Sequence, residues 1–143
     1  MSEIVLHDLV GIPYKFKGHS LESCGCFGVV HLWYKHIKHK NLPWTDGKFR
    51  LPWFFRNRKK DGEIIVNGYI GFGCVSKIID NYEDLQPGDI MVYRGLKDDY
   101  AVGVIINSDK CLTTSRKQGT CLITYKKIYR SFYKGIRIDE TKI

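Results

Sequence analysis

The sequence lacks the features that define several classes of protein. No apolar run approaches the ~20 residues that cross a bilayer, and residues 1–8 lack the basic start, the long apolar stretch and the small-residue cleavage site of a secretory signal. No internal repeat or low-complexity segment is present. The cysteines are odd in number and irregularly spaced, which predicts reduced thiols. We therefore expect no membrane span, no secretion signal and no disulfide scaffold.

The composition is that of an ordinary globular domain. Hydrophobic residues make up 43% and charged residues 27% of the chain, which excludes a disordered protein. We expect a single domain over 1–143, a length sufficient for its own core. Lys and Arg outnumber Asp and Glu by 23 to 15, a net charge of +8. This charge favours contact with nucleic acid, anionic wall polymers or an acidic protein, or simply keeps the chain soluble, and does not choose among them.

Residues 26–37 have the pattern of a helix with one buried face. Apolar side chains recur there at helical spacing, namely at Val29, Val30, Trp33, Tyr34 and Ile37. Before this helix, the Gly-Ile-Pro-Tyr segment 11–14 predicts a turn and 18–23 predicts a polar loop.

The last third of the chain alternates strand-like segments with turns. After a turn at 85–89, segments rich in β-branched residues predict strands at 90–93, 101–106, 111–114, 121–125 and 135–138. A helix followed by a run of antiparallel strands predicts the α+β class.

The stretch 43–84 is aromatic and basic and gives weaker signals. We expect 56–60 to form a solvated basic loop and 64–66 a short strand. Gly68, Gly71 and Gly73 are predicted to be turn residues, because their spacing differs from that of the dinucleotide-binding fingerprint.

Cys26 is the strongest candidate for a catalytic residue in the sequence. It follows a Ser-Cys-Gly loop and begins the predicted helix. The free N–H groups and the dipole at a helix N-terminus stabilise a thiolate, which is the nucleophilic form of cysteine. The alternative is a small buried residue without a chemical role, since free cysteine commonly packs as a compact hydrophobe.

Six short motifs occur along the chain in the same order as in a known family of proteins. They are 11–14, Gly18, 26–30 (Cys-Phe-Gly-Val-Val), 42–43, 85–90 (Leu-Gln-Pro-Gly-Asp-Ile) and 102–104 (Val-Gly-Val). Together they resemble the NlpC-type cysteine peptidases, a papain-like family, and within it most of all the phage tail-associated cell-wall peptidases.

The resemblance implies a papain-like α+β fold, in which the helix bearing Cys26 packs on an antiparallel sheet of about five strands, with 43–84 as an insertion near the mouth of the cleft. It implies that Cys26 is the nucleophile. Tyr14 would line the site and help to position the attacked carbonyl, or would be a core aromatic in a Pro-Tyr turn. In the family, the cleaved bond lies in the peptide stem of peptidoglycan, and no cofactor is implied.

The chain departs from the family's pattern at three positions. The family's general base is a histidine directly before the Val-Gly-Val segment, where this chain has Ala101. The third polar group, often a histidine, corresponds to Thr113, and an aspartate usually stands at the position of Gly25. A methyl group can neither accept a thiol proton nor protonate a leaving amine. Loss in nature explains the three joint differences better than replacement of a single histidine by design.

Two other kinds of site are less favoured. His19 is the one histidine with plausible reach to Cys26 as a substitute base. Cys24 and Cys26 are too closely spaced for the usual zinc pattern, so no metal is expected. Basic residues interleave with tyrosines over 125–137, which is compatible with nucleic-acid binding, but we favour tyrosines that alternate into the core beneath a solvated basic face.

Three functions follow. The first is a phage tail-tip or tail-assembly protein that uses a catalytically degraded NlpC-type domain as a structural or binding module. Its partners would be other tail proteins and peptidoglycan, and its location the virion or, during assembly, the host cytoplasm. The second is an active cysteine endopeptidase that cleaves peptidoglycan, with the base supplied elsewhere or engineered away at Ala101. The third is a basic nucleic-acid-binding module, which we favour least.

Overall fold

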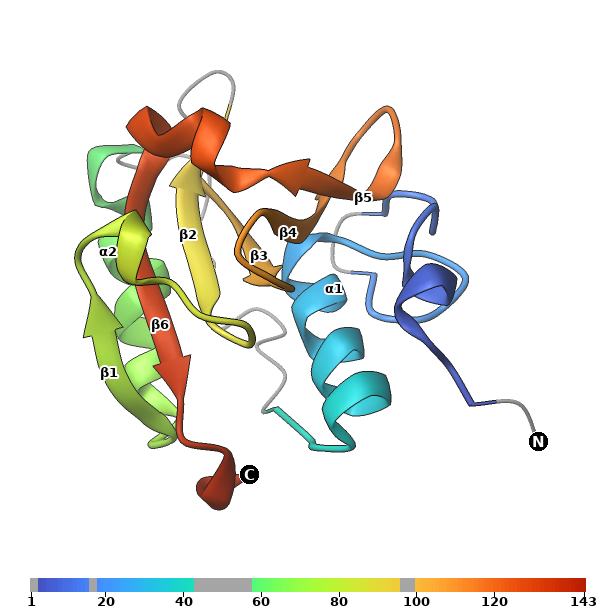
Figure 1. Cartoon of the computed structure of the whole chain (residues 1–143), viewed down its shortest axis with the longest axis horizontal. Coiled ribbons are helices and arrows are strands. Elements are labelled where there is room, and N and C mark those ends of the chain that lie inside the picture. Colours follow the sequence, from blue (N-terminus) through green and yellow to red (C-terminus); the bar gives the residue numbers. More distant parts are fainter. Residues whose placement is uncertain (1–2, 16–17, 43–57, 96–99) are drawn as a thin grey trace.

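One antiparallel sheet organises the chain, and two helices pack on one of its faces (Figure 1). The computed structural model describes residues 3–15, 18–42, 58–95 and 100–143, with the backbone alone for 58–61. The helices are α1 (Cys26–Trp33), which continues into η2 (Tyr34–Lys38), and α2 (Arg58–Gly71). Short helical turns are η1 (Leu6–Leu9), η4 (Tyr82–Asp84), η6 (Tyr125–Ser131) and η7 (Glu140–Lys142).

The sheet has the strand order β1-β6-β2-β3-β4-β5, and every neighbouring pair is antiparallel. The strands are β1 (Val75–Ile79), β2 (Ile90–Arg94), β3 (Tyr100–Ile105), β4 (Lys110–Ser115), β5 (Gly119–Thr124) and β6 (Phe132–Ile138). The α+β class and the leading helix that bears Cys26 are therefore confirmed. All five predicted strands are present, and β1 is an additional strand that its weak alternation did not reveal.

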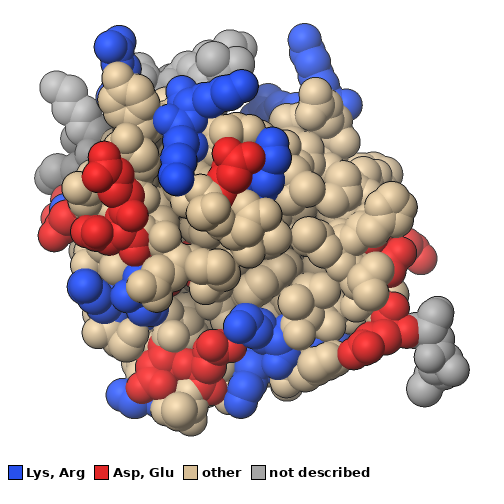
Figure 2. Space-filling model, in the orientation of Figure 1, with Lys and Arg blue, Asp and Glu red and all other residues tan. Residues whose placement is uncertain are grey.

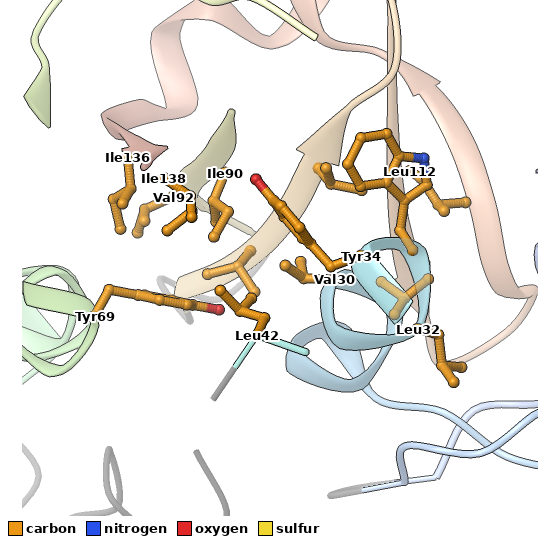
Figure 3. Close-up of a cluster of buried hydrophobic side chains, with 14 of the residues drawn as sticks. Val30, Leu32, Tyr34, Leu42, Tyr69, Ile90, Val92, Leu112, Ile136 and Ile138 are labelled. Carbon is orange, nitrogen blue, oxygen red and sulfur yellow. The ribbon is translucent and has the colours of Figure 1, made fainter. Parts of the chain in front are cut away.

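The main core lies between the helices and the sheet. Val29 and Val30 of α1 are fully buried against β3 and β4. Tyr69 of α2 and Tyr34 of η2 are buried in the same core, and Figure 3 shows the hydroxyl end of Tyr34 beside Ile90 and that of Tyr69 beside Leu42. A second, smaller cluster lies on the opposite face of the sheet, beneath η6 and η4, and includes Met91, Tyr93, Ile105, Cys111 and Tyr125.

Three expectations for the stretch 43–84 were wrong where the structure describes it. Residues 64–66 belong to α2 rather than to a strand, because Ile65, Val66 and Tyr69 share a helix face that buries against the sheet. Gly68 and Gly71 lie in the same helix, whereas Gly73 is in a turn with a φ of 77°.

The prediction of a solvated basic loop over 56–60 was also wrong in part, because α2 begins at Arg58. Residues 43–57 lie outside the described residues, so the aromatic segment and the first part of the basic run fall there. The described remainder, 58–84, supplies a core helix and a sheet strand. The described part of the stretch therefore contributes to the core and the sheet, and its role as an insertion over 43–84 near the cleft mouth remains a prediction.

The Pro-Gly-Asp turn is fixed by a buried ion pair. Gly88 adopts a φ of 92°, which favours glycine. The carboxylate of Asp89 accepts hydrogen bonds from Nε and Nη2 of Arg137 at 3.0 and 2.9 Å, and from the backbone N–H of Gln86 at 2.8 Å. Asp89 is only 2% exposed, so this pair ties the start of β2 to β6.

The N-terminal segment covers the start of the edge strand β5. The N–H of Gly11 donates to the carbonyl of Thr120, the N–H of Thr120 donates to the carbonyl of Ile12, and the N–H of Ile12 donates to Thr120 Oγ1. A Cβ at Gly119 would lie 2.0 Å from the Ile12 carbonyl oxygen. Only glycine allows this close approach.

Candidate active site

Cys26 is held at the start of α1 by a loop with several backbone hydrogen bonds. Gly25 is the N-cap in an extended conformation, and its carbonyl accepts from the N–H of Val29. The N–H of Gly25 in turn donates to the carbonyl of Gly18, and Cys24 bonds through its backbone to Pro13 and Lys15. The position of the thiol is therefore set by backbone contacts on both sides.

The Cys-x-Gly motif has a direct steric reason. A Cβ at Gly28 would lie 1.9 Å from the carbonyl oxygen of Gly18 and 3.0 Å from the Cα of His19. A glycine at position 28 lets the loop at residues 18–19 pack directly against α1, which helps to fix the position of Cys26.

The Cys26 thiol meets the sheet where β3 and β4 separate. The two strands pair only at Val104 with Leu112 and at Ile105 with Cys111. Beyond these pairs, toward the start of β3, backbone groups of Val102 interact with the thiol. The structure therefore places Cys26 next to the residue that follows Ala101.

A chain of hydroxyl groups completes this part of the site. The Thr113 hydroxyl donates to the carbonyl of Val102 at 2.9 Å. Tyr93 Oη lies 2.7 Å from Thr113 Oγ1, and because the single Thr113 proton is already used, the tyrosine is the donor. Sequence reasoning did not find Tyr93, whose partner across β2 and β3 is Ala101.

Ala101 presents only a methyl group to the other face of the sheet. It is half-buried and packs with the second cluster, on the same face as Tyr93. The neighbours Tyr100 and Val102 pack instead against the main core beneath the helices. The side chains near the point where β3 and β4 separate include those of Ala101, Thr113 and Tyr93. None of these three is a base with a pKa near neutrality.

The pKa of Cys26 moves in the direction opposite to the one predicted. Burial raises the pKa of this thiol, and the backbone groups of Val102, Phe27 and Cys26 itself lower it by less. The neighbouring Cys24 is fully buried, and its pKa rises to about 12, chiefly through burial. The helix N-terminus does not offset the loss of solvation, so the protonated thiol is the stable form at neutral pH.

His19 lies on the flank of α1 away from Cys26. Its ring is 6.2 Å from that of His31, and its Cα lies close to Gly28. Gly28 and His31 are three residues apart and share a helix face, whereas Cys26 is roughly 160° away from Gly28 around the axis. This placement disfavours His19 as a substitute base.

Tyr14 lies beside the cysteine loop. It is half-buried and forms an isolated parallel bridge with Cys24, two residues before Cys26. Its role in positioning a carbonyl remains a prediction. Within the described residues, no group of three His, Cys, Asp or Glu side chains could hold a metal ion, and no helix is long and apolar enough to span a membrane.

Comparison with known proteins identifies the fold. No protein-family model and no curated protein matches the sequence. Among solved structures, the NlpC/p60 domain of the peptidoglycan hydrolase SagA aligns with a TM-score of 0.58 at 9% identity, over 92% of both chains. NlpC2 from Trichomonas vaginalis aligns with a TM-score of 0.59 at 13% identity, over 92% of this chain and 42% of that one. An NlpC/P60 family protein from Bacillus cereus aligns with a TM-score of 0.55 at 17% identity, over 97% of this chain and 41% of that one. The chain therefore has the papain-like α+β fold of NlpC/p60 domains.

Proposed function

We propose that this chain is a phage tail-tip or tail-assembly protein, in which a catalytically degraded NlpC-type domain serves as a structural or binding module. The observation that supports it is which residues β3 and β4 carry near the point where they separate beside Cys26. At the two positions where the resemblance puts the general base and the third polar group, the chain has Ala101 and Thr113, and the Thr113 hydroxyl donates to the Val102 carbonyl. The assignment to a phage tail rests on the sequence resemblance.

The chemistry of peptide cleavage explains why these two residues matter. A general base must take the thiol proton, and a general acid must protonate the leaving amine; each such transfer contributes ~10²–10⁴-fold to the rate. Ala101 can do neither, and the Thr113 hydroxyl is committed to the Val102 carbonyl. The raised pKa of Cys26 leaves the thiol without a group that activates it.

A fold without its catalytic base remains a useful scaffold, because function depends on sites rather than on the fold. The loop that positions Cys26, the buried Asp89–Arg137 pair and the core are all intact. SagA is described as a peptidoglycan hydrolase. We infer that this chain contacts the same kind of polymer, or neighbouring tail proteins, without cleaving a bond.

Peptidoglycan cleavage tests this proposal directly. Purified protein is incubated with peptidoglycan, and new amino termini are measured beside a Cys26→Ala variant as the matched control. We expect the two proteins to give the same background. Product that depends on Cys26 would overturn the proposal and establish the alternative, an active cysteine endopeptidase.

A second variant pair tests where the activity was lost. Ala101→His and the double change Ala101→His with Thr113→His introduce histidine at the two positions that the resemblance assigns to it, and leave Cys26 unchanged. If the missing base is the main defect, the double variant gains Cys26-dependent cleavage of about 10²-fold or more over the native chain. A folded double variant with no gain would show that the cleft itself has also changed.

A further inference from the structure

The entire excess of positive charge lies in one continuous segment. Residues 110–138 contain eight Lys and Arg residues and no Asp or Glu, whereas the rest of the chain contains fifteen of each sign. The segment comprises β4, β5, η6 and β6. Such a segment produces a local positive potential where its cations are not paired with acidic residues from other parts of the chain.

Four of these cations have no partner among the described residues. Within the segment, Lys134 pairs with Asp80, Arg137 with Asp89 and Lys110 with Asp109. The remaining lysines and the hairpin arginine are exposed and make no hydrogen bond or ion pair with another described side chain; they are Arg116, Lys117, Lys126 and Lys127. Their charges therefore remain free to meet an anionic ligand.

Each pair of these cations is next in sequence to a residue that lines a pocket, Ser115 before Arg116 and Ile128 after Lys127. The β4–β5 hairpin carries Arg116 and Lys117, and η6 carries Lys126 and Lys127. The pocket has a volume of about 310 Å³, and its lining includes Ser115 and Cys121 from the hairpin, Ser131 from η6, and Tyr93 and Thr113 of the candidate active site. Figure 1 shows η6 and the hairpin along the upper side of the molecule, and in the same view of Figure 2 Lys and Arg side chains gather along that rim.

The two aromatic rings of η6 already have packing partners. Tyr125 is 2% exposed and belongs to the second cluster. Tyr129 is exposed, but its ring packs 5.7 Å from that of Tyr82 and beneath the guanidinium of Arg130. Single-stranded nucleic acids are bound largely by stacking bases on free aromatic faces, so the surroundings of these cations suit a polyanion without rings.

We propose that the β4–β5 hairpin and η6 form a binding face for a linear polyol-phosphate polymer. The cations on the two elements would contact successive phosphates, and the hydroxyl groups of Ser115 and Ser131 would bond to the polyol. This proposal goes beyond the proposed function and does not depend on the state of Cys26, so the cleavage assay and a binding assay report separately.

Binding of poly(glycerol phosphate) to the full chain tests the proposal. The site variant replaces Arg116, Lys117, Lys126 and Lys127 by Gln. The matched control replaces four exposed lysines elsewhere, Lys15, Lys35, Lys77 and Lys142, and so has the same net charge. We expect native and control proteins to bind alike, and the site variant to bind at least about 10-fold more weakly at low salt. Four phosphate contacts also predict a loss of about 50-fold in native affinity between about 50 and 200 mM salt.

Cys121 reports whether the polymer occupies the pocket. This thiol is half-buried and lines the pocket, so bound polymer should slow its alkylation. A single-stranded oligonucleotide and polyglutamate with the same number of charges complete the assay. We expect a preference for the polyol phosphate of about 3- to 10-fold, the worth of one hydrogen bond, which Ser131→Ala reduces.

Three results would overturn the proposal. The first is equal weakening by the site and control variants, which would mean that net charge alone drives binding. The second is an oligonucleotide or polyglutamate that binds as tightly as the polyol phosphate. The third is binding without protection of Cys121, which would place the polymer elsewhere.

Discussion

The buried Asp89–Arg137 pair allows a quantitative test of how the fold is held together. Asp89→Asn keeps the shape of the side chain and its bond from the Gln86 N–H, but removes the charge that faces two nitrogen atoms of Arg137. Breaking a buried pair costs ~3–5 kcal/mol. Because the Arg137 side chain is 25% exposed, water can solvate the arginine left behind, and we expect the lower end, about 3 kcal/mol of unfolding free energy.

Urea denaturation and thermal melting measure this loss. For a chain of this size, about 3 kcal/mol corresponds to a fall of roughly 6–12 °C in Tm. Asp80→Asn is the matched control, since Asp80 pairs with Lys134 at the surface and should cost less than about 1 kcal/mol. A double variant, Asp89→Asn with Arg137→Gln, should recover part of the loss, because no unpaired charge remains. Equal, small effects of Asp89→Asn and Asp80→Asn would refute the reasoning.

Two further predictions concern the cysteine loop. Because burial raises the pKa of Cys26 above its ordinary value of 9.0, its alkylation should be slower than that of a small free thiol throughout about pH 6–9 and should rise with pH; peptide-resolved mass spectrometry measures the rates, and a plateau below pH ~7 would contradict the raised pKa. Gly28→Ala should destabilise the chain by about 2 kcal/mol or more, because the new Cβ collides with the Gly18 carbonyl. Ala at Gly71, where a Cβ meets nothing within 4 Å, is the control in the same denaturation assay, and similar losses at both glycines would argue against a steric role for Gly28.

The fold was predictable where local pattern and burial agree. The buried face of 26–37 was clear because Val29, Val30 and Trp33 recur at helical spacing. The run 64–66 was misread because three consecutive apolar residues fit a strand and a helix equally well. Its helical state depends on packing of Ile65 and Tyr69 against the sheet, which local sequence does not contain.

The site was predictable in position but not in electrostatics. The position of Cys26 at a helix N-terminus suggested a lowered pKa. Burial raises this pKa instead, and the burial depends on α2 and β3, which lie far from Cys26 in the sequence. Tyr93 was missed for a related reason. Its place opposite Ala101 depends on the register between β2 and β3, and no two-residue turn fixes that register in the sequence.

The contact of 11–12 with Thr120 has a consequence for how the protein behaves among many copies of itself. An uncovered outer strand offers unpaired amide and carbonyl groups on which another chain can add. Here residues 11–12 form hydrogen bonds with Thr120 and so cover the beginning of β5. Loss of this contact would leave the molecule more prone to self-association through β5.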